Sequence, residues 1–438
     1  MVVSTSGRLI RLFRSAELAY AVVALFALTQ GPVYRVWSES NSRLGIFPNP
    51  SPHHVYFSTF VAVQLPAVVL WFRRVNIDWL RDRASQALVA LLGWLGLSVV
   101  WSTFARQSLP EFVALCLTTV FGLYLATSFS RRQLWWIILA AMALGVGVSW
   151  VSVMRLWDGA VNLQGDHWIG IYGNRNSLAP VAAVGLLASV VVVSFARERF
   201  APNWSRIVSL VAPVAVAVFA AIEMWRSSSQ TSPVALAVTV VACVAWLVVR
   251  AVTSRLGTLR ALRHHAAPLT LALLAIAAVV VLRQIGDVTN ISGDAATFNS
   301  RRALWSVNWS GFLEKPWLGW GWMAARYNPD FFRLGEWWVA FETPWSHNAY
   351  HDLLLGGGVL AAVLFVLYLW LSSCRFDRMP VSVALPRLAL IVFVLAAATQ
   401  ESFFVGSHFL WALLIASLAG ARDDVASVDE QDPSHGST

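Results

Sequence analysis

Long apolar runs recur through this sequence and constrain its fold more than any other feature. Stretches such as 134–154 and 177–196 are roughly 20 residues long, the length that an α-helix needs to cross the hydrocarbon core of a bilayer. Hydrophobic residues make up 58% of the 438 residues, and the mean hydropathy of +0.62 is too high for ordinary soluble domains. The alternating short segments of a membrane β-barrel do not occur. The sequence therefore predicts an all-α polytopic membrane protein.

We expect about 12 transmembrane helices and a single transmembrane domain over residues 1–420. The expected spans are 17–37, 53–72, 84–104, 109–129, 134–154, 177–196, 206–225, 232–250, 267–285, 349–373, 382–402 and 405–420. Two loops, 155–176 and 286–348, are longer than the others. The second is expected to contain short amphipathic helices, one of them running from Asn299 to Leu313 and stopped by Pro316. The polar tail, 421–438, is expected to be disordered.

The basic residues predict the orientation of the chain. With a cytoplasmic N-terminus, the inner loops hold most of the 32 Lys and Arg residues, which is the bias typical of membrane proteins. We therefore expect both termini in the cytoplasm, a cytoplasmic tail, and the long loop 286–348 outside. Arg8, Arg11 and Arg14 precede an apolar run as in a signal peptide, but no cleavage site follows, so this segment is expected to be an uncleaved first span.

Two classes of function receive no support from composition. The net charge of +9 does not indicate nucleic-acid binding, because the arginines are scattered at helix ends and form no single basic patch. Cys116, Cys243 and Cys374 are far apart and have no metal-ligand spacing. We expect no disulfide framework, no metal site and no other cofactor.

Polar residues crowd at 345–352, where the long outer loop meets the apolar run that begins at Leu353. An imidazole titrates near neutral pH and can act as a general base for a hydroxyl group. His347 is therefore our candidate catalytic residue, with Asn348 and Tyr350 as neighbouring candidates for substrate binding. His351 shares its helical face, whereas Asp352 is less well placed for this. A histidine at the membrane interface, bonded to a backbone carbonyl, is the alternative interpretation of His347.

Arginines at the expected outer ends are candidates for binding an anionic substrate. Arg301 and Arg302 lie in the long outer loop, and Arg226 lies at the end of a span. A guanidinium fork can hold a diphosphate in a bidentate manner, although arginines that reach toward lipid headgroups would give the same pattern. Arg175 and Asn176, at the end of the first outer loop, are further candidates for substrate binding.

The sequence does not assign a single role to its outer tryptophans or to its isolated acids. The tryptophans of the long loop suit either interfacial anchoring or packing against sugar rings. They are Trp317, Trp320, Trp322, Trp337, Trp338 and Trp345. Glu111, Glu223 and Glu401 are candidate buried acids, and no pattern gives them a function.

Several motifs resemble the O-antigen ligase and polymerase superfamily of integral membrane glycosyltransferases over about the second half of the chain. His347-Asn348 followed by Gly358 resembles the ligase signature, with Ala362 at the position where Tyr or a small residue is usual. Arg302-Ala303-Leu304-Trp305 resembles an R-x-x-W element, and Pro316–Gly321 resembles the P-x-x-G-x-G turn that follows it. Asn176-Ser177-Leu178-Ala179 resembles the N-x-x-A start of a middle span.

The resemblance implies a metal-independent transfer of a glycan from an undecaprenyl diphosphate carrier to an acceptor hydroxyl. The reaction would take place on the outer face of a bacterial cytoplasmic membrane. It implies that His347 activates the acceptor and that Arg302 helps to hold the diphosphate. A second arginine usually follows a serine just after a span. This chain reads Arg226-Ser227-Ser228 there, so Arg226, one turn earlier, is the candidate substitute.

Three functions stay open at this point. The first is a ligase whose acceptor is a lipid or another envelope component. The second is a polymerase whose acceptor is another carrier-linked glycan. The third is a transporter or flippase of about 12 spans, which is disfavoured because the sequence lacks a convincing internal repeat and its polar cluster is off-centre.

Overall fold

The computed structural model describes residues 3–34, 53–157, 159–162, 166–197, 203–255, 265–273, 295–328, 346–404 and 406–419. Its longer helices are α1 (Val3–Leu28), α3 (His53–Arg74), α4 (Arg83–Ser98), α5 (Ala105–Ser128), α6 (Arg131–Met154), α7 (Arg175–Arg197), α8 (Asn203–Arg226), α9 (Thr231–Arg255), α11 (Ala295–Glu314), α12 (Ala349–Ser373), α13 (Val381–Ala397) and α14 (Phe409–Ala419). The short 3-10 helices are η1 (Ile77–Arg81), η2 (Val99–Trp101), η4 (Ala324–Tyr327) and η6 (Phe376–Arg378). One antiparallel hairpin pairs β1 (Val161–Asn162) with β2 (His167–Trp168). The predicted all-α class is confirmed.

Six helices in the described part of the chain are long and apolar enough to cross a membrane. They cover Arg83–Trp101, Ala105–Ser128, Arg131–Met154, Arg175–Phe195, Thr231–Arg255 and Ala349–Arg378. Two shorter apolar helices, Val381–Ala397 and Phe409–Ala419, accompany them. The expected count of 12 spans stays a prediction, because span 267–285 lies mostly outside the described residues. The tail 421–438 also lies outside them, and the loop 286–348 is described only over 295–328 and 346–348.

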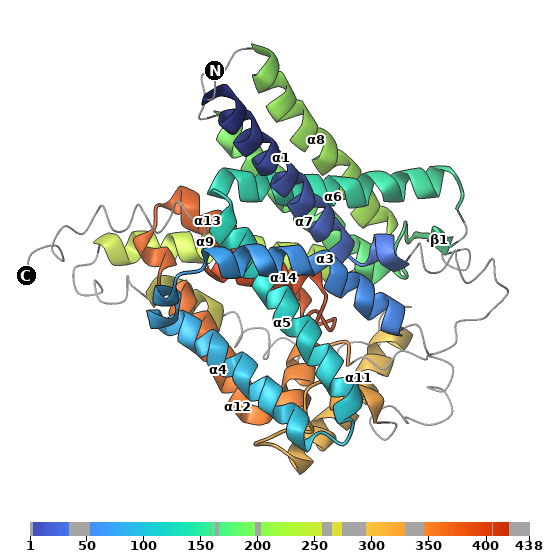
Figure 1. The fold of residues 1–438 in the computed structure, drawn as a ribbon. Helices are drawn as coiled ribbons and strands as arrows, with labels where there is room; N and C mark the ends of the chain where they lie inside the picture. The colour runs from blue at the N-terminus through green and yellow to red at the C-terminus, as the bar shows by residue number, and fades with distance from the viewer. Residues whose placement is uncertain are drawn as a thin grey trace, which may run out of the picture.

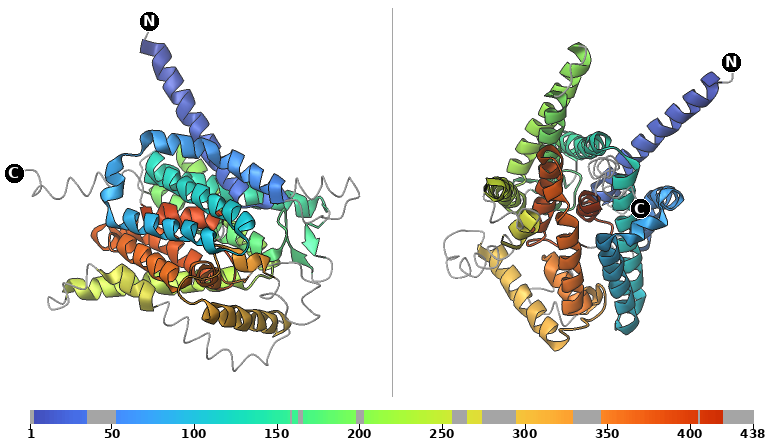
Figure 2. Two further views of the ribbon diagram at one scale, coloured as in Figure 1. Left: turned by 60° about the horizontal axis from the view of Figure 1, so that its bottom comes forward. Right: turned by 90° about the vertical axis from the view of Figure 1, so that its left-hand side faces the viewer.

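The most deeply buried helix is α14. Every residue from Phe409 to Leu418 is buried, and α14 packs against α5, α13 and α12. Figure 2 shows α14 in dark red at the centre of the surrounding helices in the right-hand view. The N-terminal part of α1 and part of α8 project from this body in Figures 1 and 2. A central apolar helix of only 11 residues is thus enclosed by longer ones.

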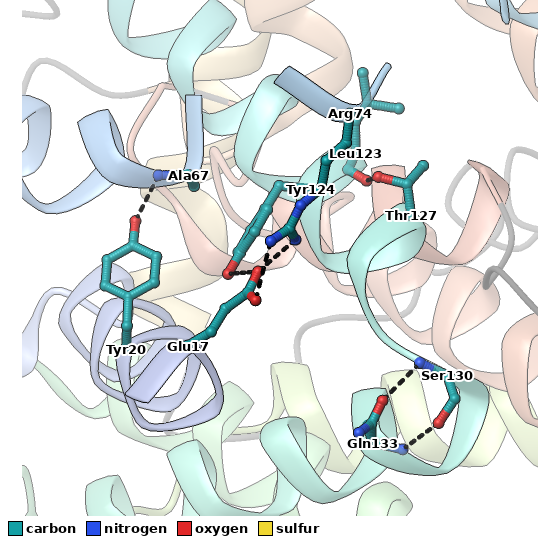
Figure 3. Close-up of polar contacts among 9 residues, drawn as sticks. All are labelled: Glu17, Tyr20, Ala67, Arg74, Leu123, Tyr124, Thr127, Ser130 and Gln133. Carbon is teal, nitrogen blue, oxygen red and sulfur yellow. Dashed lines mark hydrogen bonds and ion pairs between the residues drawn. The ribbon is translucent and has the colours of Figure 1, made fainter. Parts of the chain in front are cut away.

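Polar caps set where the helices begin. Ser130 and Gln133 form a reciprocal capping box at the start of α6, which is drawn in Figure 3. Asp82 caps α4 through Ser85 N–H, and the Asn348 side chain accepts hydrogen bonds from the N–H groups of Tyr350 and His351 at the start of α12. These side chains satisfy N–H groups that have no partner within the helix.

Two groups of polar contacts join distant segments, and we name each group by one of its residues. The Glu17 end joins the middle of α1 to the end of α3 and to α5: Glu17 accepts from Arg74 at 2.5 and 3.1 Å and from the Tyr124 hydroxyl at 3.1 Å (Figure 3). The His347 end joins segments that the sequence predicts to be outside, as described below.

Tyr20 adds a further contact between α1 and α3. Its hydroxyl donates to the Val63 carbonyl at 2.8 Å and accepts from Ala67 N–H at 3.0 Å, beside Pro66. Because Pro66 has no N–H group, it interrupts the hydrogen-bond ladder of α3, and an inserted hydroxyl is a known companion of such interruptions. Figure 3 shows this tyrosine reaching from α1 to Ala67.

Helix α12 is broken at Gly358, where the backbone takes φ 67° and ψ −166°. The turn Pro316–Gly321 fills the break: Val359 N–H donates to the Pro316 carbonyl at 2.8 Å, and Trp320 N–H donates to the Leu355 carbonyl at 2.7 Å. A Cβ on Gly319 would lie 2.6 Å from the Leu355 oxygen, and one on Gly358 would overlap the Trp317 carbonyl. The two glycines therefore permit a backbone approach that other residues would block.

Candidate functional site

His347 is the centre of the polar cluster at the His347 end. It precedes the N-cap residue of α12 and adopts a left-handed backbone with φ 47°, which is uncommon for a residue other than glycine. Its Nδ1 atom lies 2.8 Å from Oε2 of Glu401, which belongs to the turn between α13 and α14. The His347 side chain is 24% exposed and the Glu401 side chain is 12% exposed. The pair is thus partly shielded but reachable.

Glu401 extends this contact into a chain of hydrogen bonds. Its Oε1 atom accepts from the Asn176 amide nitrogen at 2.7 Å. The Asn176 amide oxygen accepts from the Ser229 hydroxyl at 2.9 Å. Ser229 lies in the turn between α8 and α9, and Asn176 lies in the first turn of α7. Hydrogen bonds therefore link four segments that are far apart in the sequence, and two of them, those of His347 and Asn176, contact the Glu401 carboxylate.

The pairing has a direct chemical consequence for the imidazole. When Nδ1 carries the hydrogen that is donated to Glu401, the other ring nitrogen, Nε2, has a free lone pair. A carboxylate that holds Nδ1 in this way fixes the tautomer and also stabilises the imidazolium formed on proton uptake. The arrangement suits a general base that takes a proton at Nε2.

Helix α11 contacts the His347 segment through Trp305. The indole Nε1 of Trp305 donates to the Ser346 carbonyl at 3.0 Å, and its ring meets that of His351 at 6.1 Å between centroids. Trp305 belongs to the R-x-x-W element, one helical turn after Arg302. The turn of α11 that carries Arg302 is therefore next to the segment that carries His347. The side chains of Arg301 and Arg302 lie outside the described part of the structure.

Two of the predicted substrate-binding residues make contacts within the fold. The Asn348 side-chain oxygen is engaged in capping α12, as described above. The Tyr350 hydroxyl donates to the Leu395 carbonyl at 2.8 Å, and its ring packs edge-on against Phe404. Their role in substrate binding stays a prediction.

The other two predicted arginines lie at the same end of the molecule. Arg226 lies over the Trp168 ring, 5.4 Å from its centroid, and its Nη2 atom is 3.5 Å from Asp166. The Asp166 side chain is 80% exposed, so this pair is weak. Arg175 is the first residue of α7, next to Asn176, and makes no hydrogen bond or ion pair with any described residue.

Sequence reasoning did not select three acids of this end. Glu401 lies at the expected outer end of a span, on the same predicted side of the membrane as His347. This shared side was the sequence signal that could have selected it. Glu111 accepts from Arg326 Nη1 at 2.7 Å and from the Tyr327 hydroxyl at 3.1 Å. Burial, reinforced by the charge of Glu111, raises the pKa of Tyr327. Asp352 is the third acid, buried in the first turn of α12.

Within the described ranges, no group of three or more His, Cys, Asp or Glu side chains could hold a metal ion. The three cysteines are free thiols. The polar residues that do gather are an imidazole, a carboxylate, an amide and a hydroxyl.

Comparison with known proteins identifies one region. Residues 215–366 match the family model described as Wzy_C, O-antigen ligase. The matched region includes His347, Trp305 and Gly358, whereas Asn176 and Glu401 lie before and after it. No curated protein matches the chain. The match confirms the resemblance inferred from the motifs: residues 215–366 are similar to the O-antigen ligase family.

Proposed function

We propose that this protein transfers a glycan from an undecaprenyl diphosphate carrier to an acceptor hydroxyl on the outer face of a bacterial cytoplasmic membrane. Both termini would then lie in the cytoplasm. The observation that carries the proposal is the pairing of His347 with Glu401, which supports His347 as a base within the region similar to the O-antigen ligase family. The family match supports a ligase or polymerase type of reaction.

In the proposed reaction, His347 Nε2 removes the proton of the acceptor hydroxyl. The acceptor oxygen forms a bond to the anomeric carbon while the bond from that carbon to the diphosphate oxygen breaks. The electron pair leaves with the carrier diphosphate, and the anomeric centre is inverted. The imidazolium that results is paired with Glu401 and later loses its proton to water.

The proposed transfer depends more on positive charge that stabilises the departing diphosphate than on an unusually strong nucleophile. Arg302 and Arg301 on α11 are the proposed diphosphate ligands, with Arg226 and Arg175 as the neighbouring cations at this end. A diphosphate is already a good leaving group, so positioning and charge stabilisation can supply most of the acceleration without a metal ion. Asn176 would orient Glu401 and limit the movement of the pair.

The test is a transfer assay with the purified protein in detergent, carrier-linked glycan as donor, and a panel of acceptors. We expect free carrier diphosphate and glycosylated acceptor with the wild type, and loss of both with His347→Ala and Arg302→Ala. His265→Ala is the matched control, because His265 stacks on Trp370 away from this site and its loss should leave transfer intact.

The acceptor panel also distinguishes the two branches of the superfamily. A product formed only when the acceptor is a second carrier-linked glycan would identify a polymerase, and a product on a lipid or envelope acceptor would identify a ligase. Transfer that survives His347→Ala would contradict the proposed role of the base.

A further inference from the structure

The interface between α11 and α12 contains a buried amide whose polar atoms make no hydrogen bond. Asn308, on α11, is 1% exposed, and neither its Oδ1 atom nor its Nδ2 atom has a hydrogen-bond partner in the described part of the chain. The Nδ1 atom of His351, on α12, is likewise buried and without a partner among the described residues. Folded proteins leave few buried polar groups in this state, so each one calls for a physical explanation.

Contacts on either side of Asn308 place it between the two helices. One turn before it, the Trp305 ring meets the His351 ring at 6.1 Å between centroids. One turn after it, Phe312 belongs to a small apolar cluster that also contains Leu355 of α12. Because residues three and four apart share a face of a helix, the buried Asn308 side chain faces α12 between these two contacts.

Helix α11 also connects Asn308 to the proposed reaction site. Trp305 donates to the carbonyl of Ser346, the residue before His347. Arg302, a proposed diphosphate ligand, lies one turn before Trp305. In the proposed reaction the transferred sugar lies between the base and the leaving diphosphate. Asn308 is therefore on the helix that borders the place of this sugar.

A purely structural role explains the amide poorly. A buried donor or acceptor that makes no hydrogen bond destabilises the fold, so a leucine of similar size would fill the same interface at a lower cost. An amide has one group that donates and one that accepts, and it carries no charge. These properties match the hydroxyl groups of a sugar better than the oxygens of a phosphate, which only accept.

We propose that Asn308 and the Nδ1 atom of His351 bind a hydroxyl group of the donor sugar that is attached to the diphosphate. The sugar reaches them as α11 moves away from α12, the helix against which α11 mainly packs. The polar atoms that make no hydrogen bond in the closed interface lower the cost of this movement, and the sugar supplies the bonds that they lack. The inference rests on the proposed function, because it adds a donor-binding residue to the same site.

The experiment compares Asn308→Leu with the wild type in two measurements. In the transfer assay, with donor and acceptor varied separately, we expect the KM for carrier-linked glycan to rise about ten-fold while the KM for the acceptor stays unchanged. In thermal unfolding without substrate, we expect the variant to be at least as stable as the wild type, because leucine removes the amide that lacks hydrogen bonds. A structural role predicts the reverse, which is lower stability with an unchanged KM for the donor.

Gln64→Met is the matched control. Gln64 is a fully buried amide on α3 whose Oε1 atom has no partner among the described residues, while its Nε2 atom donates to the Phe60 carbonyl at 3.1 Å. Its replacement should leave both KM values unchanged. His351→Phe tests the second polar atom, because it keeps a ring against Trp305 and removes Nδ1. This variant should also raise the KM for the donor several-fold.

The outcomes separate this inference from the proposed function. If the wild type transfers glycan and Asn308→Leu keeps the wild-type KM for the donor, the sugar subsite is refuted while His347 remains the base. If Asn308→Leu fails to fold, an unchanged donor KM in His351→Phe refutes the subsite. Absence of transfer by the wild type would refute the proposed function. In that case carrier-linked glycan should still raise the unfolding temperature of the wild type more than that of Asn308→Leu, and an equal rise in both would refute the subsite.

Discussion

The two ends of the molecule use similar residue types in opposite ways. At the Glu17 end, both carboxylate oxygens of Glu17 bind Arg74, and the Tyr124 hydroxyl adds a third hydrogen bond (Figure 3). All three residues sit on regular helices. At the His347 end, the carboxylate of Glu401 binds an imidazole and an amide, and the imidazole keeps one nitrogen available. The first carboxylate is saturated by a cation, and the second leaves a reactive atom open.

The backbone conformations of the two ends also differ. Residues with positive φ at the His347 end include His347 at 47°, Ser228 at 52° and Ser407 at 65°, whereas Glu17, Arg74 and Tyr124 are all helical. Left-handed conformations of residues other than glycine cost about 1–3 kcal/mol and collect at functional sites. We therefore propose that the Glu17 end stabilises the fold and that the strained backbone of the His347 end holds the geometry of the proposed reaction.

The sharpest test of this contrast replaces one glutamate at each end. Glu401→Gln should lower kcat by about 10²-fold, because the amide no longer fixes the tautomer or stabilises the imidazolium. Glu17→Gln should leave kcat within about two-fold of the wild type but lower the unfolding temperature, since Arg74 loses its charged partner. Transfer assays and thermal unfolding in the same detergent measure both effects.

The reverse pattern would overturn the comparison. A Glu401→Gln protein with normal turnover and reduced stability would make His347–Glu401 a structural pair. A Glu17→Gln protein that folds normally but is inactive would bring the Glu17 end into the function.

Disrupting the junction between the turn Pro316–Gly321 and the break in α12 should give the next largest effect. Gly358→Ala should destabilise the protein by about 1–3 kcal/mol, because alanine is strained at positive φ and its Cβ overlaps a backbone carbonyl. Activity should fall as well, since α11 and the His347 segment share this junction. Gly147→Ala in α6 is the control: nothing lies within 4 Å of a Cβ there, so its stability should be unchanged or slightly higher.

The break also shows what a sequence can and cannot predict. The apolar runs predicted most helices, because bilayer-spanning segments are set by composition over roughly 20 residues. The run from Leu353 onward is apolar throughout, and its three consecutive glycines, Gly356 to Gly358, weaken the helix there without predicting which residue leaves it. The break exists because the Pro316–Gly321 turn supplies its hydrogen bonds, and that turn is remote in the sequence.

The candidate site divides in the same way. His347 was predictable because a polar cluster at the edge of an apolar run is a local signal. Its pairing with Glu401, and the contact of Glu401 with Asn176, depend on how distant helices pack, which no local pattern contains. Asn348 is an intermediate case: an Asn just before an apolar run is a recognised helix cap, so its structural role could have been predicted along with a functional one.

A smaller effect is expected from loosening the contact between α11 and the His347 segment. Trp305→Phe keeps an aromatic ring but removes the N–H group that bonds the Ser346 carbonyl. A typical hydrogen bond contributes about 1 kcal/mol, so we expect kcat to fall several-fold with KM little changed. Trp309→Phe is the control, because Trp309 lies one turn later on the same helix and is half exposed. Equal losses in both variants would exclude a specific role for Trp305.

The smallest effect should come from acid titration of the pair that Asp82, the N-cap residue of α4, forms with Arg375, which follows α12. Burial alone would raise the pKa of Asp82, but the hydrogen bond and charge of Arg375 outweigh it and lower that pKa. A carboxyl with a lowered folded-state pKa stabilises the fold above its unfolded pKa of about 4 and loses this contribution as pH falls further. Because the side chains are 36% exposed, solvent screens the pair to at most about 1 kcal/mol.

Asp82→Asn should therefore have a slightly lower unfolding temperature than the wild type at pH 7, and the difference should shrink in acid. Asp78→Asn, at an exposed position, is the control and should leave the unfolding temperature unchanged. A gap that persists in acid would mean that Asp82 acts as a helix cap and that its charge contributes nothing.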